Sequence, residues 1–189
     1  MNHVFIGGTS GAGKSTLARK IAKDLGLQHE NLDDFREEME RFPKTEYWVN
    51  YFWNQDPREY WEKTKPEMRW DHLVEQSESF WPHYLRLFDD LTKSNKRCVL
   101  ESVNILPHLA KDLPFNGIYM VCDSIPDLLP RYLKEPRWSK DPELIKKEVE
   151  NSVLVKAPRY RAEAEKYGFK CFSSMENAEE ELIRLINLS

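Results

Sequence analysis

The chain lacks three features that would assign it to common classes of protein. It has 28 Lys and Arg against 32 Asp and Glu, a formal net charge of −4, so it has no basic excess of the kind that binds nucleic acid or anionic lipid. No stretch approaches the ~18 consecutive apolar residues of a membrane helix. The first residues also lack the basic and apolar regions of a secretory signal. We therefore expect a cytoplasmic protein with neither a nucleic-acid nor a membrane partner.

Cysteine is scarce as well. The three cysteines, Cys98, Cys122 and Cys171, are an odd number without a C-x-x-C pair. Each lies in or beside a short apolar run typical of a strand, so we expect reduced thiols in the core. The five histidines show no i, i+4 pair and no nearby cysteine, which disfavours a zinc site. A chain of 189 residues, 40% of them hydrophobic, is long enough for one domain over residues 1–189.

Glycine is both scarce and clustered. The chain has seven glycines, and Gly7, Gly8, Gly11 and Gly13 fall within seven positions. Residues 8–15, Gly-Thr-Ser-Gly-Ala-Gly-Lys-Ser, fit the pattern G-x-x-x-x-G-K-[ST] and are called the phosphate loop below. Such a loop turns backbone N–H groups toward a phosphate chain at the start of a helix. The predicted phosphate-binding residues are Gly8, Thr9, Ser10, Gly11, Ala12, Gly13, Lys14, Ser15 and Thr16.

Short apolar runs alternate with helical patterns along the chain. We predict strands over residues 3–7, 28–32, 96–101, 117–123 and 169–173, and helices over residues 16–25 and 177–188. This alternation is typical of an α/β fold with a parallel sheet. A tryptophan-rich region, about 36–95, is predicted to be an inserted helical region. A basic, proline-bracketed segment, about 131–142, is predicted to be a loop between two helices.

Two motifs of GTP-dependent switches are missing. The glycines outside the cluster, Gly26, Gly117 and Gly168, have no aspartate three residues before them, so D-x-x-G is absent. The guanine-reading N-K-x-D also fails, because Asn95-Lys96-Arg97 is followed by Cys98. A GTP switch is therefore disfavoured.

Residues 5–16, Phe-Ile-Gly-Gly-Thr-Ser-Gly-Ala-Gly-Lys-Ser-Thr, resemble the Walker A segment of P-loop small-molecule kinases. These include nucleoside monophosphate kinases, uridine kinase, shikimate kinase and 2-phosphoglycerate kinase. The resemblance implies a three-layer fold with five parallel strands in the order 2-3-1-4-5, a helical insert and a lid at 131–142. It also implies ATP and Mg²⁺ as cofactors, and phosphoryl transfer to a small acceptor.

Two further segments carry the resemblance. Leu32-Asp33-Asp34-Phe35 is similar to the D-x-F motif on the second strand of uridine kinase and pantothenate kinase, which implies that Asp33 is the catalytic base. Residues 99–107, Val-Leu-Glu-Ser-Val-Asn-Ile-Leu-Pro, are similar to E-G-V-x-x-x-P of 2-phosphoglycerate kinases, with Ser102 in place of their glycine.

Each candidate catalytic residue has a structural alternative. A carboxylate at the end of the strand beside the phosphate loop can accept a proton from an acceptor hydroxyl, which favours Asp33 over Asp34. Alternatively, one of these two caps the following helix. Glu101, at a strand end, is a candidate Mg²⁺ ligand together with Ser15, or else the partner of a lysine or a backbone N–H.

Basic side chains of the loop and the predicted lid complete the candidate machinery. Lys14 is expected to reach the β- and γ-phosphates. Arg131 and Arg137 are candidate lid arginines that neutralise transferred charge, or else they belong to a solvated basic loop.

The tryptophans divide into two groups. Trp70 and Trp81 lie on the apolar stripe of a long helix that Pro82 is expected to bend, so we predict core packing for them. Trp48, Tyr51, Trp53 and Trp61 are candidates for a stacking wall that holds a base or sugar, or for the core of the insert.

The sequence thus predicts an ATP-dependent kinase of a nucleoside, a sugar, a sugar acid or a phosphorylated metabolite. The alternative is a regulatory ATPase whose helical insert binds a protein partner. The identity of the acceptor and the oligomeric state stay open.

Overall fold

Five parallel strands form the centre of the structure, a computed structural model that describes residues 3–94 and 96–188. Their order is β2-β3-β1-β4-β5, as the resemblance implied. The strands are β1 (Val4–Gly8), β2 (Gln28–Asn31), β3 (Cys98–Glu101), β4 (Gly117–Met120) and β5 (Lys170–Phe172). Each lies within a predicted run, except that β1 extends one residue further. The ends of the predicted domain, residues 1, 2 and 189, lie outside the described residues.

The register brings three strand ends together. Glu101 of β3 lies opposite Ile6 of β1 on one side and opposite Asn31 of β2 on the other. Gly8, the last residue of β1, lies opposite Met120 of β4. Because the carboxyl ends of parallel strands share one edge of the sheet, the residues that follow β1, β2 and β3 must meet there.

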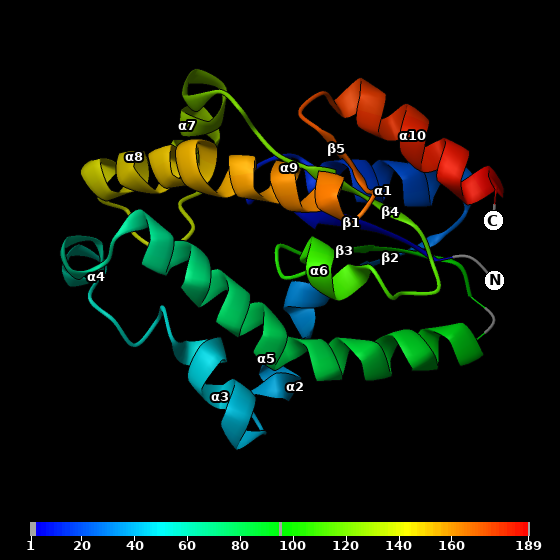
Figure 1. Cartoon of the computed structure of the whole chain (residues 1–189), viewed down its shortest axis with the longest axis horizontal. Helices are drawn as coiled ribbons and strands as arrows, with labels where there is room; N and C mark the ends of the chain where they lie inside the picture. Colours follow the sequence, from blue (N-terminus) through cyan, green and yellow to red (C-terminus); the bar gives the residue numbers. More distant parts are fainter. Residues whose placement is uncertain (1–2, 95, 189) are drawn as a thin grey trace.

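Side chains alternate between the two faces of the sheet and build a core on each. Val4 and Ile6 pack with α1 (Lys14–Leu25) and α10 (Met175–Leu188). Phe5 points to the opposite face, into a cluster with residues of α5 (Pro66–Lys93), α6 (Pro107–Ala110) and α9 (Ala157–Lys166). The sheet therefore lies between two helical layers, which confirms the three-layer α/β fold (Figure 1).

The first helix follows directly from the phosphate loop. It begins at Lys14, two residues before the predicted start, and ends where the Gly26 N–H bonds to the carbonyl of Ala22. Gly26 adopts a left-handed conformation with φ 65°, which an L side chain adopts only at a cost. Leu17 and Ile21 are buried against the sheet.

The tryptophan-rich region is helical. After a 3₁₀ turn, η1 (Leu32–Phe35), come α2 (Arg36–Met39), α3 (Pro43–Asn50), α4 (Pro57–Lys63) and α5. Proline stands at the start of α3, α4 and α5, where its missing N–H needs no partner. Residue 95, the end of the predicted region, lies outside the described residues.

The long helix α5 behaves as its apolar stripe predicted. Trp70 and Trp81 pack against the main core cluster, which confirms core packing for both. The axis of α5 changes direction about halfway along (Figure 1), and Pro82 lies inside the helix. A proline there removes one i→i−4 hydrogen bond and crowds the preceding turn, which accounts for the bend.

The prediction that residues 131–142 form a loop is wrong in part. Arg131 and Lys134 belong to the last turn of α7 (Ile125–Lys134), and Pro142 is the first residue of α8 (Pro142–Asn151). The non-helical segment is thus shorter, residues 135–141. Pro130 lies inside α7 and does not end the helix there.

The three cysteines are free, as predicted. Cys98 and Cys122 are buried, whereas Cys171 is partly exposed. Within residues 3–94 and 96–188, no helix is both long and apolar enough to cross a membrane.

A histidine between two glutamates ties α5, α6 and α9 together. His108 of α6 lies 3.0 Å from Glu163 of α9 and 3.5 Å from Glu78 of α5. The hydrogen bond with Glu163 raises the pKa of His108, although burial opposes the shift.

Since the folded pKa lies above the ordinary value of about 6.5, the charged pair stabilises the fold fully below that pH. Its contribution is lost as the pH rises through the folded pKa. We expect Glu163→Gln to lower the free energy of unfolding by about 1–2 kcal/mol near pH 6 and by less near pH 9. Urea unfolding at several pH values measures the difference. Glu165→Gln, at an exposed position of the same helix, is the control, and an equal loss at both pH values for Glu163→Gln would contradict the assignment.

Candidate functional site

The phosphate loop curls back on itself at the end of β1. Three of its glycines have positive φ, with values of 119° at Gly8, 73° at Gly11 and 99° at Gly13. A Cβ on Gly8 would collide with the backbone carbonyl of Met120 on β4. The loop is also tied to β4 by a hydrogen bond from the Thr9 N–H to that carbonyl, 3.0 Å long. The glycines of the loop are therefore needed for two reasons, the positive φ angles of the backbone and the close approach of Gly8 to the backbone of β4.

Lys14 lies folded over its own loop. Its ammonium donates a hydrogen bond of 2.9 Å to the Thr9 carbonyl, and the side chain is buried. Burial lowers the pKa of Lys14 to about 8, with a smaller contribution from Arg137. The charges of Glu101 and Asp33 act in the opposite direction. The loop thus holds a cation that lacks full compensation inside the protein.

Glu101 lies almost fully buried beside Ser15. Its Oε1 is 3.5 Å from His29 Nε2 and has no hydrogen-bond partner among the described residues. Burial by itself raises the pKa of Glu101. The side chains of His29 and Ser15 and the charge of Lys14 outweigh it, so the pKa lies below its ordinary value. A buried, ionised oxygen without a donor is suited to a cation.

Asp33 is held in place, whereas Asp34 is exposed. Asp33 Oδ1 accepts hydrogen bonds of 3.1 Å from Ser102 Oγ and 3.1 Å from Arg36 Nη2. The capping alternative is wrong, because the following helix, α2, has Phe35 at its N-cap and no side-chain cap hydrogen bond. The preceding turn, η1, is capped by Asn31, whose side chain accepts from the Asp33 N–H.

Three polar residues around Asp33 were not among the predicted site residues. Arg36 Nη2 also donates to Asn104 Oδ1, and the buried Asn104 donates to Ser77 Oγ on α5. Ser102 donates to Asp33 and accepts from the Asn104 N–H. The E-S-V-N stretch after β3 was the only sequence signal for Ser102 and Asn104, and the partners of Arg36 are set by the fold.

The two candidate lid arginines line two different spaces, each of which contains a residue of the phosphate loop. Arg131 donates a hydrogen bond of 2.8 Å to the Gly11 carbonyl and lines a hollow together with Ala12. Arg137 lines a second, inner space together with Ser10. The hollow, called the outer hollow, has a volume of about 280 Å³. It is lined by Ala12, Val121, Cys122, Asp123, Ser124, Asp127, Arg131, Ser173 and Met175.

The inner space, called the central cavity, has a volume of about 180 Å³. Its polar lining residues are Ser10, Arg36, Arg69, Gln76, Arg137, Glu148, Asn151 and Lys156. Its apolar and aromatic lining residues are Val49, Phe52, Trp53, Tyr60, Trp61, Leu73, Val103 and Trp138. The volume is below the 300–1,000 Å³ of drug-sized sites, so the cavity suits a small molecule. Asp33 is not among the lining residues, but Arg36, which donates a hydrogen bond to Asp33, is.

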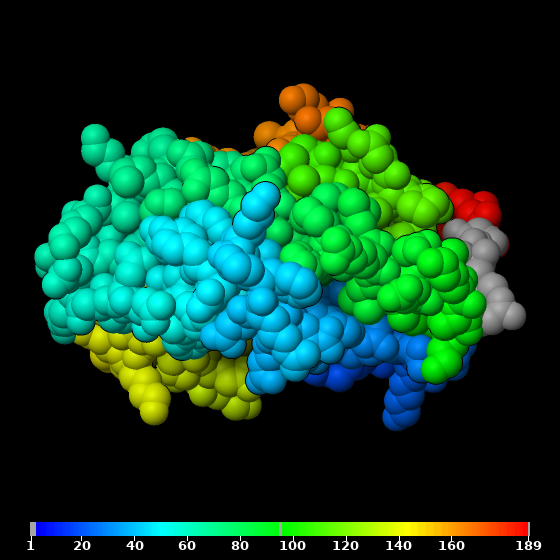
Figure 2. Space-filling model, turned by 90° about the horizontal axis from the view of Figure 1, so that it is seen from below, coloured from blue at the N-terminus to red at the C-terminus, as the bar shows by residue number. Residues whose placement is uncertain are grey.

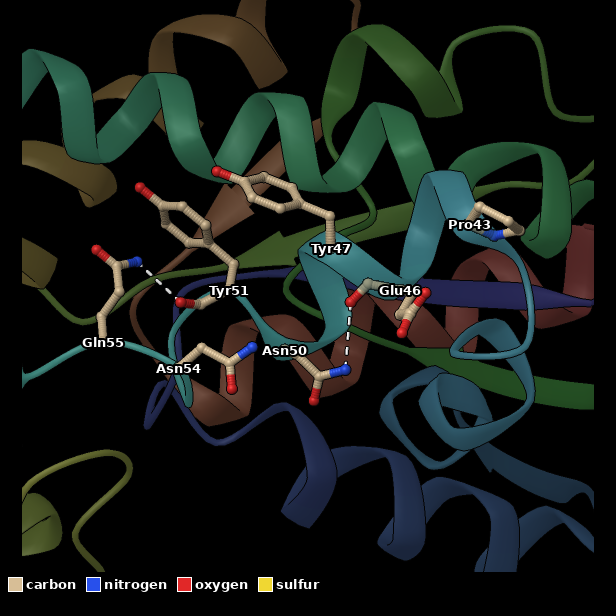
Figure 3. A pocket seen from close by; sticks show the side chains of 7 residues that line it. All are labelled: Pro43, Glu46, Tyr47, Asn50, Tyr51, Asn54 and Gln55. Carbon is tan, nitrogen blue, oxygen red and sulfur yellow. Dashed lines mark hydrogen bonds between the residues drawn. The ribbon is translucent and has the colours of Figure 1, made fainter.

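The predicted aromatic wall is only partly assembled there. Trp53 and Trp61 line the central cavity. Trp48 packs against the main core cluster instead. Tyr51 faces a different hollow, shown in Figure 3 with Tyr47, Asn50 and other residues of α3 and the turn after it. This hollow of about 560 Å³ contains no residue of the phosphate loop, so its larger volume does not make it the site.

The helical region and the segment after α7 meet beside the central cavity. Arg58 at the start of α4 forms an ion pair with Asp141. The rings of Phe52 and Tyr60 contact the Trp138 ring edge-on. The centroid of the Trp138 ring lies 5.5 Å from that of Phe52 and 5.1 Å from that of Tyr60. Figure 2 shows the cyan residues of the helical region against the yellow residues near position 140. The cavity therefore has walls from segments about eighty residues apart.

The loop geometry predicts unequal effects of alanine at two glycines. Gly8→Ala meets both the positive φ and the Met120 carbonyl, so we expect a loss of more than about 2 kcal/mol in the free energy of unfolding, together with loss of ADP binding. Gly26→Ala, where no atom lies within 4 Å of the new Cβ, should cost about 1 kcal/mol and leave ADP binding unchanged. Urea unfolding and calorimetric titration measure both. Wild-type ADP affinity in Gly8→Ala would contradict the role of the loop.

The lowered pKa of Lys14 predicts proton uptake when ADP binds. A phosphate group, whose own pKa is about 6, is fully ionised near pH 8.5 and favours the charged lysine. The ammonium pKa therefore rises on binding, and the complex takes up a fraction of a proton. Titration in two buffers with different ionisation enthalpies measures it. Lys14→Arg, which stays charged at this pH, should abolish the uptake, and equal heats in both buffers for the wild type would refute it.

Comparisons with known proteins support the fold but no closer relationship. No protein-family model and no curated protein matches the sequence. The structure is similar to that of shikimate kinase from Bacteroides thetaiotaomicron, with 14% identity, coverage of 98% of this chain and 98% of that chain, and a TM-score of 0.56. It is similar to shikimate kinase from Acinetobacter baumannii in complex with shikimate, with 20% identity, coverage of 98% and 93%, and a TM-score of 0.51.

A deoxyadenosine kinase from M. mycoides with bound dATP is likewise similar, with 16% identity, coverage of 98% and 99%, and a TM-score of 0.51. At these identities the likeness concerns the fold. The predicted resemblance is confirmed at that level: the chain has the α/β fold of P-loop small-molecule kinases.

Proposed function

We propose that this protein is an ATP-dependent kinase that transfers the γ-phosphoryl group to a hydroxyl of a small molecule in the central cavity. The observation that carries the proposal is that residues of the phosphate loop line two separate spaces. The outer hollow and the central cavity both contain loop residues, Ala12 and Ser10 respectively. A phosphoryl donor on one side and an acceptor on the other would then meet over the loop, which is the positioning that phosphoryl transfer requires.

The loop is suited to the phosphates of ATP. Backbone N–H groups of the phosphate loop, other than the N–H of Thr9, and the positive end of α1 favour an anion at this point. Lys14 would bind the β- and γ-phosphates, and the outer hollow would take the rest of the nucleotide. Arg131 lines that hollow and donates a hydrogen bond to the Gly11 carbonyl of the loop.

Ser15 and Glu101 would hold Mg²⁺ that accompanies ATP. The unpartnered Glu101 oxygen beside Ser15 supports this assignment. When bound, the ion would neutralise phosphate charge during transfer.

Asp33 would accept the proton of the acceptor hydroxyl. Both of its hydrogen bonds from side chains reach Oδ1, which leaves Oδ2 to face an incoming hydroxyl. Arg36 and Ser102 fix the carboxylate, so its orientation costs little at the moment of transfer. General-base catalysis of this kind contributes about 10²–10⁴-fold.

Arg137 would stabilise the charge of the transferred group. It lines the cavity beside Ser10, and its charge lowers the pKa of Lys14, so it acts on the region where Lys14 meets the phosphates. The walls around it also limit access of water, which competes with the acceptor.

The alternative of a regulatory ATPase is less well supported. In that case the helical region would present its surface to a protein partner. Instead, several of its side chains, including Arg36, Trp61 and Arg69, line the central cavity next to the loop. This lining favours a small acceptor over a protein partner.

Asp33→Asn tests the proposal, with Asp34→Asn as the matched control at the neighbouring exposed position. ADP release is measured at saturating MgATP with nucleosides, sugars, sugar acids and phosphorylated sugars. For the compound that stimulates the wild type, we expect Asp33→Asn to lower kcat by about 10²–10⁴-fold with nearly unchanged ATP affinity. Asp34→Asn should keep wild-type activity.

Lys14→Met completes the test, because it should abolish turnover even at saturating ATP. Full activity of Asp33→Asn would remove the assigned base. A panel in which no compound raises ADP release above the basal rate would contradict the kinase proposal itself.

A further inference from the structure

The central cavity contains more positive charge than phosphoryl transfer at the loop requires. Four cationic side chains line it, Arg36, Arg69, Arg137 and Lys156, against one carboxylate, Glu148, among the described residues. Arg36 is compensated by Asp33 at 3.1 Å, and Arg137 lies 3.8 Å from Glu135. Arg69 and Lys156 differ from these two in their surroundings.

Arg69 and Lys156 lack a close acidic partner. Within residues 3–94 and 96–188, neither side chain has a carboxylate oxygen within 4.0 Å. Arg69 is nevertheless rigidly placed. Its Nε donates to Thr64 Oγ1 at 2.9 Å, and its guanidinium stacks 4.1 Å from the centre of the Trp61 ring. Two cations held near each other in a partly buried site are unfavourable unless an anion lies between them.

The charges are ordered from the phosphate loop outward. Arg137 acts on the pKa of Lys14, and both Arg137 and Lys156 lower the pKa of Glu148 against the larger effect of burial. Burial lowers the pKa of Lys156, the charge of Glu148 acts in the opposite direction, and the charge of Arg69 lowers it further. Arg69 also lines a hollow with Pro66 and Leu154 that contains no residue of the phosphate loop. Arg69, with Lys156 beside it, therefore lies at the end of the cavity remote from Lys14.

A turn of π-helix brings two of the cavity residues to one side. In the turn η2 (Ser152–Lys156), the N–H of Ala157 bonds to the carbonyl of Ser152, five residues earlier. Pro158 follows and has no N–H for the Leu154 carbonyl, which explains why the α-helical pattern is interrupted here. In a regular α-helix, residues five apart point about 140° away from each other. The wider turn lets both Asn151 and Lys156 line the cavity.

Asn151 shows independently that a polar ligand is missing from the protein's own contacts. It is only 6% exposed, and its Oδ1 has no hydrogen-bond partner among the described residues. Arg36 Nε is likewise buried without a partner. Buried polar atoms nearly always have a hydrogen-bond partner. A bound molecule could therefore donate a hydrogen bond to Asn151 Oδ1 from a hydroxyl group and accept one from Arg36 Nε with an anionic group.

We propose that the phosphoryl acceptor carries an anionic group of its own, a carboxylate or a phosphate, which Arg69 and Lys156 bind at the end of the cavity remote from Lys14. This inference rests on the proposed kinase function. A hydroxyl of the same molecule then lies toward Ser10, Arg137 and Asp33, and receives the γ-phosphoryl group while Asp33 takes the hydroxyl proton and ADP leaves. A neutral nucleoside or sugar would leave the two cations uncompensated.

The first experiment compares matched sets of acceptors. Glycerol, glycerate and glycerol phosphate form one set, and ribose, ribonate and ribose 5-phosphate form another. At saturating MgATP we expect ADP release with anionic members and at least about 100-fold lower kcat/KM with the neutral member of the same set. The carboxylate and phosphate arms identify which anion is preferred. Equal kcat/KM for neutral and anionic members would overturn the inference while the kinase proposal stands.

The second experiment does not depend on turnover. The protein is saturated with a non-hydrolysable ATP analogue and Mg²⁺, so that the phosphate loop is occupied, and inorganic phosphate and citrate are added while the melting temperature is measured. We expect these anions to raise the melting temperature of the wild type. No rise with either anion would overturn the inference even if the protein proves to be a kinase.

Two variants locate the effect. Lys156→Gln should weaken anion binding by at least about tenfold, and Lys146→Gln, at an exposed lysine of α8 that lies outside the cavity lining, should not change it. Glu148→Gln removes the one carboxylate and should tighten anion binding, a gain that a damaged fold would not produce. Unchanged anion affinity in both Lys156→Gln and Glu148→Gln would overturn the assignment of the site to this cavity.

Discussion

The site depends on one constraint, the reversal of the chain at Gly8 against the carbonyl of Met120. The strand β1 must stop there, because only a residue without a side chain fits between the two backbones. The loop that follows has its N–H groups gathered at the start of α1, between the ends of the flanking strands. Glu101 and Asp33 are then brought beside Lys14 by strand order alone, since β3 and β2 end at the same edge. The grouping of these three charged residues is thus a property of sheet topology first and of side chains second.

Charge is concentrated at this edge and in the central cavity in a way that costs stability. Lys14 is buried with a lowered pKa, and Lys156 and Arg69 lie close enough to influence each other. A fold selected for stability alone would pair these groups with carboxylates or replace them with apolar residues. Cations such as Arg69, held in fixed positions by aromatic rings and hydrogen bonds, are suited to bind an anion without rearrangement.

The sequence predicted the parts of this site that are local. The phosphate loop and the five strands followed from a short motif and from the alternation of apolar runs, and the strand order followed from the resemblance to P-loop small-molecule kinases. The charged end of the central cavity could not be predicted, because Arg69 lies in α5 and Lys156 follows α8, and only tertiary packing brings them together. The π-helical turn was also hidden, since Pro158 signals an interruption of a helix but not its geometry. Arg131 was misplaced in a loop because Pro130 resembles a helix terminator, yet α7 continues past it.

The division of the site between scaffold and walls has an evolutionary consequence. The loop and the strand ends belong to the sheet, whereas Trp61, Arg69 and Trp138 belong to segments attached outside it. Substitutions in those segments alter the shape and charge of the central cavity without moving the loop backbone. Selection can therefore change which molecule is recognised while the apparatus at the strand ends is kept, and lineages that share the architecture can diverge until little sequence identity is left.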